Sequence, residues 1–119
     1  FEVKDDGACH RTGNFFFEHM KYSRAGNLTD GYMRVEFADY LVVHSEAAQH
    51  CWFLDMPALQ KDGFYETGRY IPNCHNQTRS AGFLHSIAVM RRDGFLLAEC
   101  DYEFDVCGQP IAKNVILYE

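Results

Sequence analysis

A strict two-residue alternation over residues 95–107 constrains the fold more than any other feature of this sequence. Even positions from Leu96 to Val106 are apolar, aromatic or thiol-bearing, and odd positions from Glu99 to Asp105 all carry carboxylates. Side chains alternate between faces along a strand, whereas a helix needs apolar residues three and four apart. The pattern predicts a long strand with one face on a core and an acidic face in solvent, as antiparallel sheets allow.

Turn-rich stretches divide the rest of the chain into short segments typical of strands. Asp93-Gly94 between two apolar runs is a strong hairpin signal. Residues 45–60 are the most helix-like segment, although residues 51–54 also fit a buried strand. The 119 residues have the usual size of one domain. We therefore expect a single domain, residues 1–119, that is mainly β: an antiparallel β-sandwich or barrel of seven to eight strands with one short helix. The expected strands are residues 15–22, 32–44, 64–71, 83–90, 95–107 and 111–118.

The charge balance limits the classes of partner. The net charge is −6, and nearly half of the residues are hydrophobic, with 15% aromatic. Nucleic acids and anionic membranes attract a positive field, which this chain lacks. A membrane-spanning helix needs about 18 consecutive apolar residues, and the sequence has no such run. We expect neither a nucleic-acid nor a membrane partner.

The five cysteines allow at most two intramolecular bridges and leave one thiol over. A bridge from Cys100 to Cys107 is excluded if both lie on one strand, because they would be roughly 23 Å apart and a disulfide needs Cα atoms within about 7 Å. Cys100 also falls on the apolar side of the alternation. We expect Cys100 to be a buried free thiol and the bridges to use Cys9, Cys51, Cys74 and Cys107.

Several features are typical of a secreted protein. The chain starts at Phe1 rather than at Met, as a mature protein does after its signal peptide is removed. Asn27 and Asn76 each begin an Asn-X-Thr acceptor sequence for glycosylation. Together with the cysteines, these features predict an extracellular, glycosylated protein.

A histidine–carboxylate group is the strongest catalytic candidate. His44, Glu46 and His50 lie within seven consecutive residues, and on a helix Glu46 and His50 would share a face. A His with a carboxylate can perform acid–base chemistry, and with an Arg it could cleave a phosphodiester. The alternative is a charge pair on a solvated surface, and no nucleophile motif accompanies the group.

Metal binding has two weak candidates. Cys9-His10 and Cys74-His75 offer the sulfur and nitrogen ligands that zinc takes, but without the spacing of zinc sites. The acidic face of residues 99–105 could attract calcium, although a straight strand spreads its carboxylates too far apart to wrap an ion. We expect no metal and no cofactor.

Two further groups are candidates for binding. Arg91 and Arg92 form a basic turn that could contact a partner, although polar turns are usually only solvated. Trp52, with nearby aromatic residues, could bind a sugar or a protein if exposed, although a Trp beside a cysteine is more often in the core.

The chain length, the early Cys9, the late Cys107 and the strand-rich content together resemble the small secreted effector proteins of plant-pathogenic fungi. The resemblance extends over the whole chain and rests on no motif. It implies a sandwich, barrel or ribonuclease-like fold and an action through binding host proteins, and it assigns a role to no residue.

These observations favour a secreted, monomeric protein that acts without catalysis by binding a partner protein through loops at one end of its sheets. One alternative is a secreted, ribonuclease-like hydrolase that uses His44, Glu46 or His50 with an Arg. A second is a β-sandwich that carries an apolar ligand between its sheets, which the ten Phe residues permit.

Overall fold

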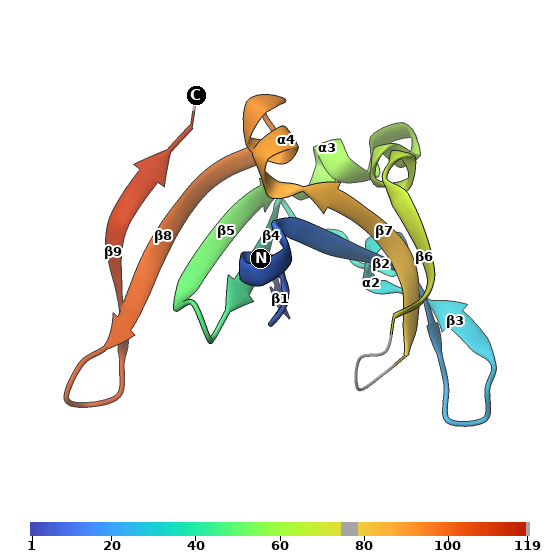
Figure 1. The fold of residues 1–119 in the computed structure, drawn as a ribbon, viewed down its shortest axis with the longest axis horizontal. Helices are drawn as coiled ribbons and strands as arrows, with labels where there is room; N and C mark the ends of the chain where they lie inside the picture. The colour runs from blue at the N-terminus through green and yellow to red at the C-terminus, as the bar shows by residue number, and fades with distance from the viewer. Residues whose placement is uncertain (75–78, 119) are drawn as a thin grey trace.

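The computed structural model describes residues 1–74 and 79–118. Two β-sheets make up most of this part of the chain, with strand orders β1-β4-β5-β8-β9 (sheet A) and β3-β2-β7-β6 (sheet B) (Figure 1). The prediction of a mainly β, sandwich-like fold is confirmed. Strand bounds are β1 Glu2–Asp5, β2 Asn14–Tyr22, β3 Leu28–Asp30, β4 Tyr40–Ser45, β5 His50–Asp55, β6 Arg69–Cys74, β7 Ser80–Ser86, β8 Leu96–Phe104 and β9 Pro110–Leu117.

The two sheets are closest beneath α3 and α4 and splay apart away from these helices (Figure 1). Every strand pair is antiparallel except the one between β1 and β4, which is parallel. The long β8–β9 hairpin lies at the outer edge of sheet A, and β9 is its last strand. The described part of the chain therefore leaves one side of β9 without a neighbouring strand.

Short helices replace several parts of the expected strands. Residues 32–44 do not form one strand, because α2 occupies Tyr32–Val35 and the strand β4 starts only at Tyr40. The strand expected at residues 83–90 ends at Ser86, whose side chain caps the next helix by accepting from Val89 N. A side-chain cap of this kind favours a helix start over a continued strand. The helical elements are α1 Cys9–Thr12, α2 Tyr32–Val35, α3 Met56–Gln60, the 3-10 helix η1 Lys61–Thr67 and α4 Ile87–Arg92.

The segment expected to be most helical is mainly a strand. Residues 46–49 form a turn, β5 follows, and only Met56–Gln60 is helical. This helix starts where Asp55 accepts from Ala58 N and Pro57 occupies the first turn, which is a favourable place for proline. Asp93-Gly94 connects α4 to β8 and so does not form the expected hairpin turn.

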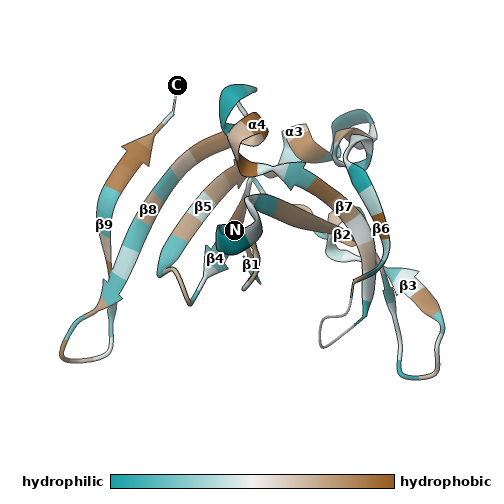
Figure 2. Ribbon diagram, viewed as in Figure 1, coloured by the Kyte–Doolittle hydropathy of each residue, from teal (hydrophilic) through white to brown (hydrophobic). Residues whose placement is uncertain are grey.

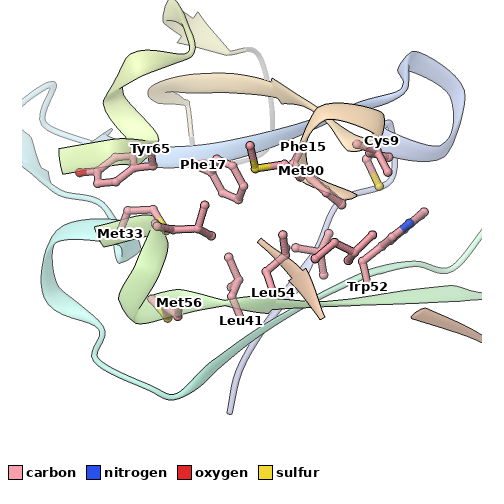
Figure 3. Close-up of a cluster of buried hydrophobic side chains, with 14 residues drawn as sticks. Cys9, Phe15, Phe17, Met33, Leu41, Trp52, Leu54, Met56, Tyr65 and Met90 are labelled. Carbon is pink, nitrogen blue, oxygen red and sulfur yellow. The ribbon is translucent and has the colours of Figure 1, made fainter. Parts of the chain in front are cut away.

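The core fills the space where the sheets face each other (Figure 3). Phe15 and Phe17 of β2 point toward Leu41 of β4 and Leu54 of β5, and these four side chains have no exposed surface. Trp52 packs edge-on against Phe15, with ring centroids 5.7 Å apart, so its expected place in the core is confirmed. Figure 2 shows apolar residues where the sheets meet and again near the end of β9.

The faces of β8 differ from the expectation. The pairing with β5 shifts at a bulge, so Leu54 is opposite Leu96 but Trp52 is opposite Glu99. Residues opposite each other in a sheet share a face, and a bulge reverses the alternation. Glu99 therefore points to the same side as Trp52 and is only 7% exposed, whereas Phe104 is 56% exposed. The prediction of an apolar inner face and a solvated acidic face is wrong beyond Leu96.

Among the described residues, no helix is both long and apolar enough to cross a membrane.

Candidate functional site

A cluster of hydrogen-bonded polar side chains lies on the inner face of sheet A, beside α4. We call it the Glu99 cluster, because three of its members bond directly to Glu99. Asp101 bonds to His50, and Asn114 bonds to Asp101. Its members are His50 of β5, Arg91 of α4, Glu99 and Asp101 of β8, Asn114 of β9 and Tyr118 just after β9.

Glu99 is the centre of these contacts. Its Oε2 accepts from Arg91 Nη2 at 2.9 Å and Nε at 3.1 Å, and from the Tyr118 hydroxyl at 2.6 Å. Its Oε1 lies 3.0 Å from His50 Nε2. Both oxygens of this nearly buried carboxylate are thus occupied by donors, which offsets the cost of removing its charge from water.

The environment of Glu99 favours its ionised form. Burial alone would raise the pKa of Glu99, but the hydrogen bonds from Tyr118 and Arg91, the charge of Arg91 and the bond from His50 outweigh burial, so the pKa lies below its usual value. The same contact with Glu99 raises the pKa of Arg91. Hydrogen bonds from Asn114 and His50 lower the pKa of Asp101.

His50 is held between two carboxylates. Its Nδ1 lies 2.6 Å from Asp101 Oδ1 while its Nε2 faces Glu99, and its ring packs edge-on against Trp52 with centroids 4.6 Å apart. Each ring nitrogen therefore has a carboxylate oxygen within hydrogen-bonding distance. In this geometry neither nitrogen is available to take a proton from a substrate.

A second histidine near the Glu99 cluster, His10, pairs with Ser45. Ser45 Oγ is 2.9 Å from His10 Nδ1, which superficially resembles a nucleophile with its base. Ser45 has no exposed surface, and its hydroxyl also accepts from Ala48 N at 3.2 Å. The pair therefore joins α1 to the end of β4 rather than presenting a hydroxyl to a substrate.

The cleft above these groups is open and has a volume of about 520 Å³. His10 and Gly13 line one side, Ala88 and Arg91 of α4 line another, and the sheet forms the floor. A larger hollow of about 810 Å³ lies elsewhere, between the β1 edge of sheet A, with the segment that follows β1, and one face of sheet B. Charged residues of both signs line it, among them Asp6 and Arg69.

The free edge of β9 is the other unusual surface. All eight residues of this strand are exposed, including Ile116 at 47% and Leu117 at 74%. Two main-chain hydrogen bonds determine which peptide groups of β9 point away from β8. Tyr118 N donates to Leu97 O, and Asp105 N donates to Gln109 O, both at 2.9 Å.

Antiparallel pairs alternate between bonded and non-bonded positions. Counting from these two bonds along the register, Ile116 and Lys113 bond to β8, whereas the N–H groups of Ala112 and Leu117 point to the free edge. Proteins usually shorten or cover such an edge, or protect it with charge, because it offers an unpaired ladder to another strand. On β9 itself, Lys113 is the one charged residue between Pro110 and Leu117.

Comparison with known proteins gives no family for this chain: no family model, curated protein or solved structure matches it.

The catalytic candidates are not brought together as expected. Of the three, only His50 joins an Arg and carboxylates, and its partners Glu99 and Asp101 come from β8 rather than from residue 46. His44 is the register partner of Cys51 and points to the outer face of sheet A. Its Nδ1 lies 3.9 Å from Asp5 Oδ1. Glu46 lies in the exposed turn before β5.

The two arginines of the expected binding turn have different surroundings. Arg91 is part of the Glu99 cluster, with its side chain 39% exposed. Arg92 is 71% exposed and pairs with its neighbour Asp93, at 2.9 Å. A partner-binding role for these residues stays a prediction.

The cysteines are all free thiols in the structure, and the four bridge candidates lie in different places. Cys9 and Cys100 are buried, Cys51 and Cys74 are half-buried, and Cys107 is exposed in the turn between β8 and β9. The burial expected for Cys100 is confirmed. Its neighbour across the sheet is Cys51, a pairing that the sequence did not suggest.

The remaining candidates concern metal binding and glycosylation. No group of three potential ligands is close enough to hold a metal ion in the part of the chain that the structure describes. His75 and the second acceptor site, Asn76, lie outside the described residues. Asn27 is exposed in the connection between β2 and β3, where an attached sugar would meet no obstacle from the core.

Sequence reasoning missed Glu99, Asp101, Asn114 and Tyr118 as members of one site. A carboxylate on an alternating strand gives no sign of burial unless the bulge that reverses the alternation is known. One weak signal exists: residues 96–98 are all apolar, so the phase of the alternation is ambiguous at that point.

Proposed function

We propose that this chain is a secreted, effector-type protein that acts without catalysis, by binding an extended segment of a partner protein along β9. The segment adds to sheet A as a sixth strand. The observation that carries the proposal is the free edge of β9, which is eight residues long and exposed throughout.

Strand addition uses main-chain hydrogen bonds for affinity and side-chain contacts for specificity. The outward N–H groups of Ala112 and Leu117 are the positions where these bonds form. Beside them, Val115, Ile116 and Leu117 offer three consecutive exposed apolar side chains on both faces of the sheet. Burying this surface against an apolar segment supplies the driving force.

The face of sheet A that points away from sheet B supports the same partner chemistry. One row of register partners crosses all five strands and is entirely apolar, and it reaches the free edge at Leu117. The row consists of Val3, Val42, Phe53, Ala98 and Leu117. An apolar segment at β9 would extend this row by one strand.

The charge of this chain indicates which residues the partner segment carries. The chain carries a net charge of −6, and Glu103 and Asp105 lie beside the start of β9. Lys113 pairs with Glu103 at 2.8 Å. Complementary charges favour association, whereas like charges oppose it. The expected partner segment is therefore extended and apolar, with Lys or Arg at its flanks.

The Glu99 cluster supports a binding protein more than a hydrolase. Acid–base catalysis needs a group that can exchange a proton with the substrate. Here both nitrogens of His50 and both oxygens of Glu99 are already bonded within the protein, and Ser45 is buried. The apolar-ligand alternative gains no support from the larger hollow, because charged residues of both signs, among them Asp6 and Arg69, line it.

The test uses peptides selected from a random library of roughly 12-residue displayed sequences, a length that can pair with the whole of β9. Selected peptides are then titrated against the wild-type protein and against Ala112→Pro and Leu117→Pro. Each substitution removes an edge-facing N–H and leaves the bonds to β8 intact, as proline on an edge strand allows. Losing one main-chain bond should weaken binding by roughly tenfold.

Leu117→Ala is the matched control, because it shortens the side chain but keeps the N–H. We expect it to weaken binding less than Leu117→Pro does. Circular dichroism and the unfolding midpoint of each variant verify that the fold is retained. The proposal is wrong if the selected peptides bind both proline variants as tightly as they bind the wild-type protein.

A further inference from the structure

Two cysteines lie directly opposite each other on neighbouring strands. Cys51 of β5 and Cys100 of β8 are register partners, between the pairs His50–Asp101 and Trp52–Glu99. Since Trp52 and Glu99 point to the inner face, both thiols point to the outer face of sheet A. No other cysteine is a register partner of a second cysteine among the strand pairs that the structure describes.

The backbone geometry suits a bond between them. Tyr102 N donates to Gln49 O at 2.9 Å, and the alternation from this bond places Cys51 and Cys100 at a hydrogen-bonded position. Cα atoms at such positions are about 5.5 Å apart, which is within the range of about 4.4–6.8 Å found for disulfides. The bond therefore needs no change of register, but the Cβ atoms, about 5.5 Å apart at such positions, must draw together to the roughly 3.5–4.5 Å of a disulfide.

The surroundings determine how readily the bond forms. Burial and the neighbouring Cys100 raise the pKa of Cys51 to about 11, and burial with Asp101 raises the pKa of Cys100. The thiolate is the reactive form, so both groups react slowly with oxidants near neutral pH. Cys51 is half-buried and Cys100 is buried, so Cys51 is the thiol that an incoming reagent reaches first.

We propose that Cys51 and Cys100 form a reversible disulfide that links β5 to β8, with a small-molecule disulfide such as oxidised glutathione as the oxidant. The Cys51 thiolate attacks one sulfur of the oxidant and releases the first glutathione thiolate. The Cys100 thiolate then attacks the Cys51 sulfur and releases the second. The protein loses two protons and two electrons, and one oxidised glutathione becomes two reduced molecules.

This pairing differs from the bridges expected from the sequence, which left Cys100 as a free thiol. It is independent of partner binding at β9, because neither residue lies on that strand. A covalent link across the middle of sheet A also stabilises the folded protein, because it restricts the conformations of the unfolded chain.

The experiment starts from fully reduced, folded protein in oxidised glutathione at pH 8.5. Remaining thiols are blocked with iodoacetamide, and the protein is digested and analysed by mass spectrometry without reduction. The expected result is a peptide pair linked through Cys51 and Cys100, which disappears after treatment with dithiothreitol. The wild-type protein, Cys51→Ser, Cys100→Ser and Cys107→Ser are compared, and the last is the control because Cys107 is exposed and distant in the turn.

The thermal midpoint gives a second, independent measurement. Oxidation should raise it by roughly 5 °C or more in the wild-type protein and in Cys107→Ser. The same treatment should leave it unchanged in Cys51→Ser and in Cys100→Ser. The proposal is overturned if folded protein yields no linked Cys51–Cys100 peptide, if the link forms only in urea, or if oxidation raises the midpoint equally in Cys51→Ser.

Discussion

Neutralising Glu99 is the change that tests the polar cluster most sharply. Glu99→Gln keeps the shape of the side chain but removes the charge that Arg91 and His50 contact, and its new amide N–H₂ faces donors instead of acceptors. Four donor contacts reach this carboxylate: two from Arg91, one from Tyr118 and one from His50. Breaking a buried ion pair on one side costs about 3–5 kcal/mol. Arg91 is 39% exposed and recovers some hydration, so we expect a loss of about 2 kcal/mol.

Glu103→Gln is the matched control on the same strand. Glu103 also accepts from a cation, Lys113, but both side chains are about half exposed. Exposed pairs contribute about 0–1 kcal/mol, so this variant should lose roughly 0.5 kcal/mol or less. Urea unfolding followed by the fluorescence of Trp52, the one Trp of the chain, measures both variants. Losses that agree within about 0.5 kcal/mol would refute the reasoning that burial sets the strength of the cluster.

Three other consequences are measurable on the purified protein. Glu99 and Asp101 have lowered pKa values when folded, so the unfolded chain binds more protons in acid. The urea midpoint should fall as the pH drops below the ordinary values of 4.5 and 3.8, and less steeply in Glu99→Gln. RNA should remain intact with the wild-type protein, and turnover that disappears in His50→Ala would contradict a non-catalytic function. Gly82→Ala should lose about 2 kcal/mol or more, because the new Cβ would clash with the backbone oxygen of Phe17 in β2. Gly7→Ala meets no atom within 4 Å and should lose roughly 0.5 kcal/mol or less.

The strands with clear alternation could be found from the sequence because the pattern reflects a local property of the chain. β2, β8 and β9 lie within the ranges expected for them or within one residue of those ranges. The β-rich, two-layer fold followed from the number of such segments and from the turns between them. These features depend on neighbouring residues and need no knowledge of which strands pair.

Features that depend on pairing could not be found in this way. The phase of β8 reverses at the bulge between Leu96 and Ala98, which exists only because β5 pairs with both sides of it. Tyr32–Val35 alternates like a strand but is helical, since its neighbours in space decide its conformation. The Glu99 cluster joins β5 to three elements that come much later in the sequence, α4, β8 and β9, and no local pattern signals that meeting.

The binding proposal depends most directly on which peptide groups of β9 are unpaired. Amide hydrogen exchange of the free protein, measured residue by residue by NMR, reports this. We predict that Ile116 and Lys113 are protected by their bonds to β8, that Ala112 and Leu117 exchange at close to unprotected rates, and that a selected peptide protects the latter two. Protection of Ala112 and Leu117 in the free protein, or their unchanged exchange with the peptide bound, would contradict the account.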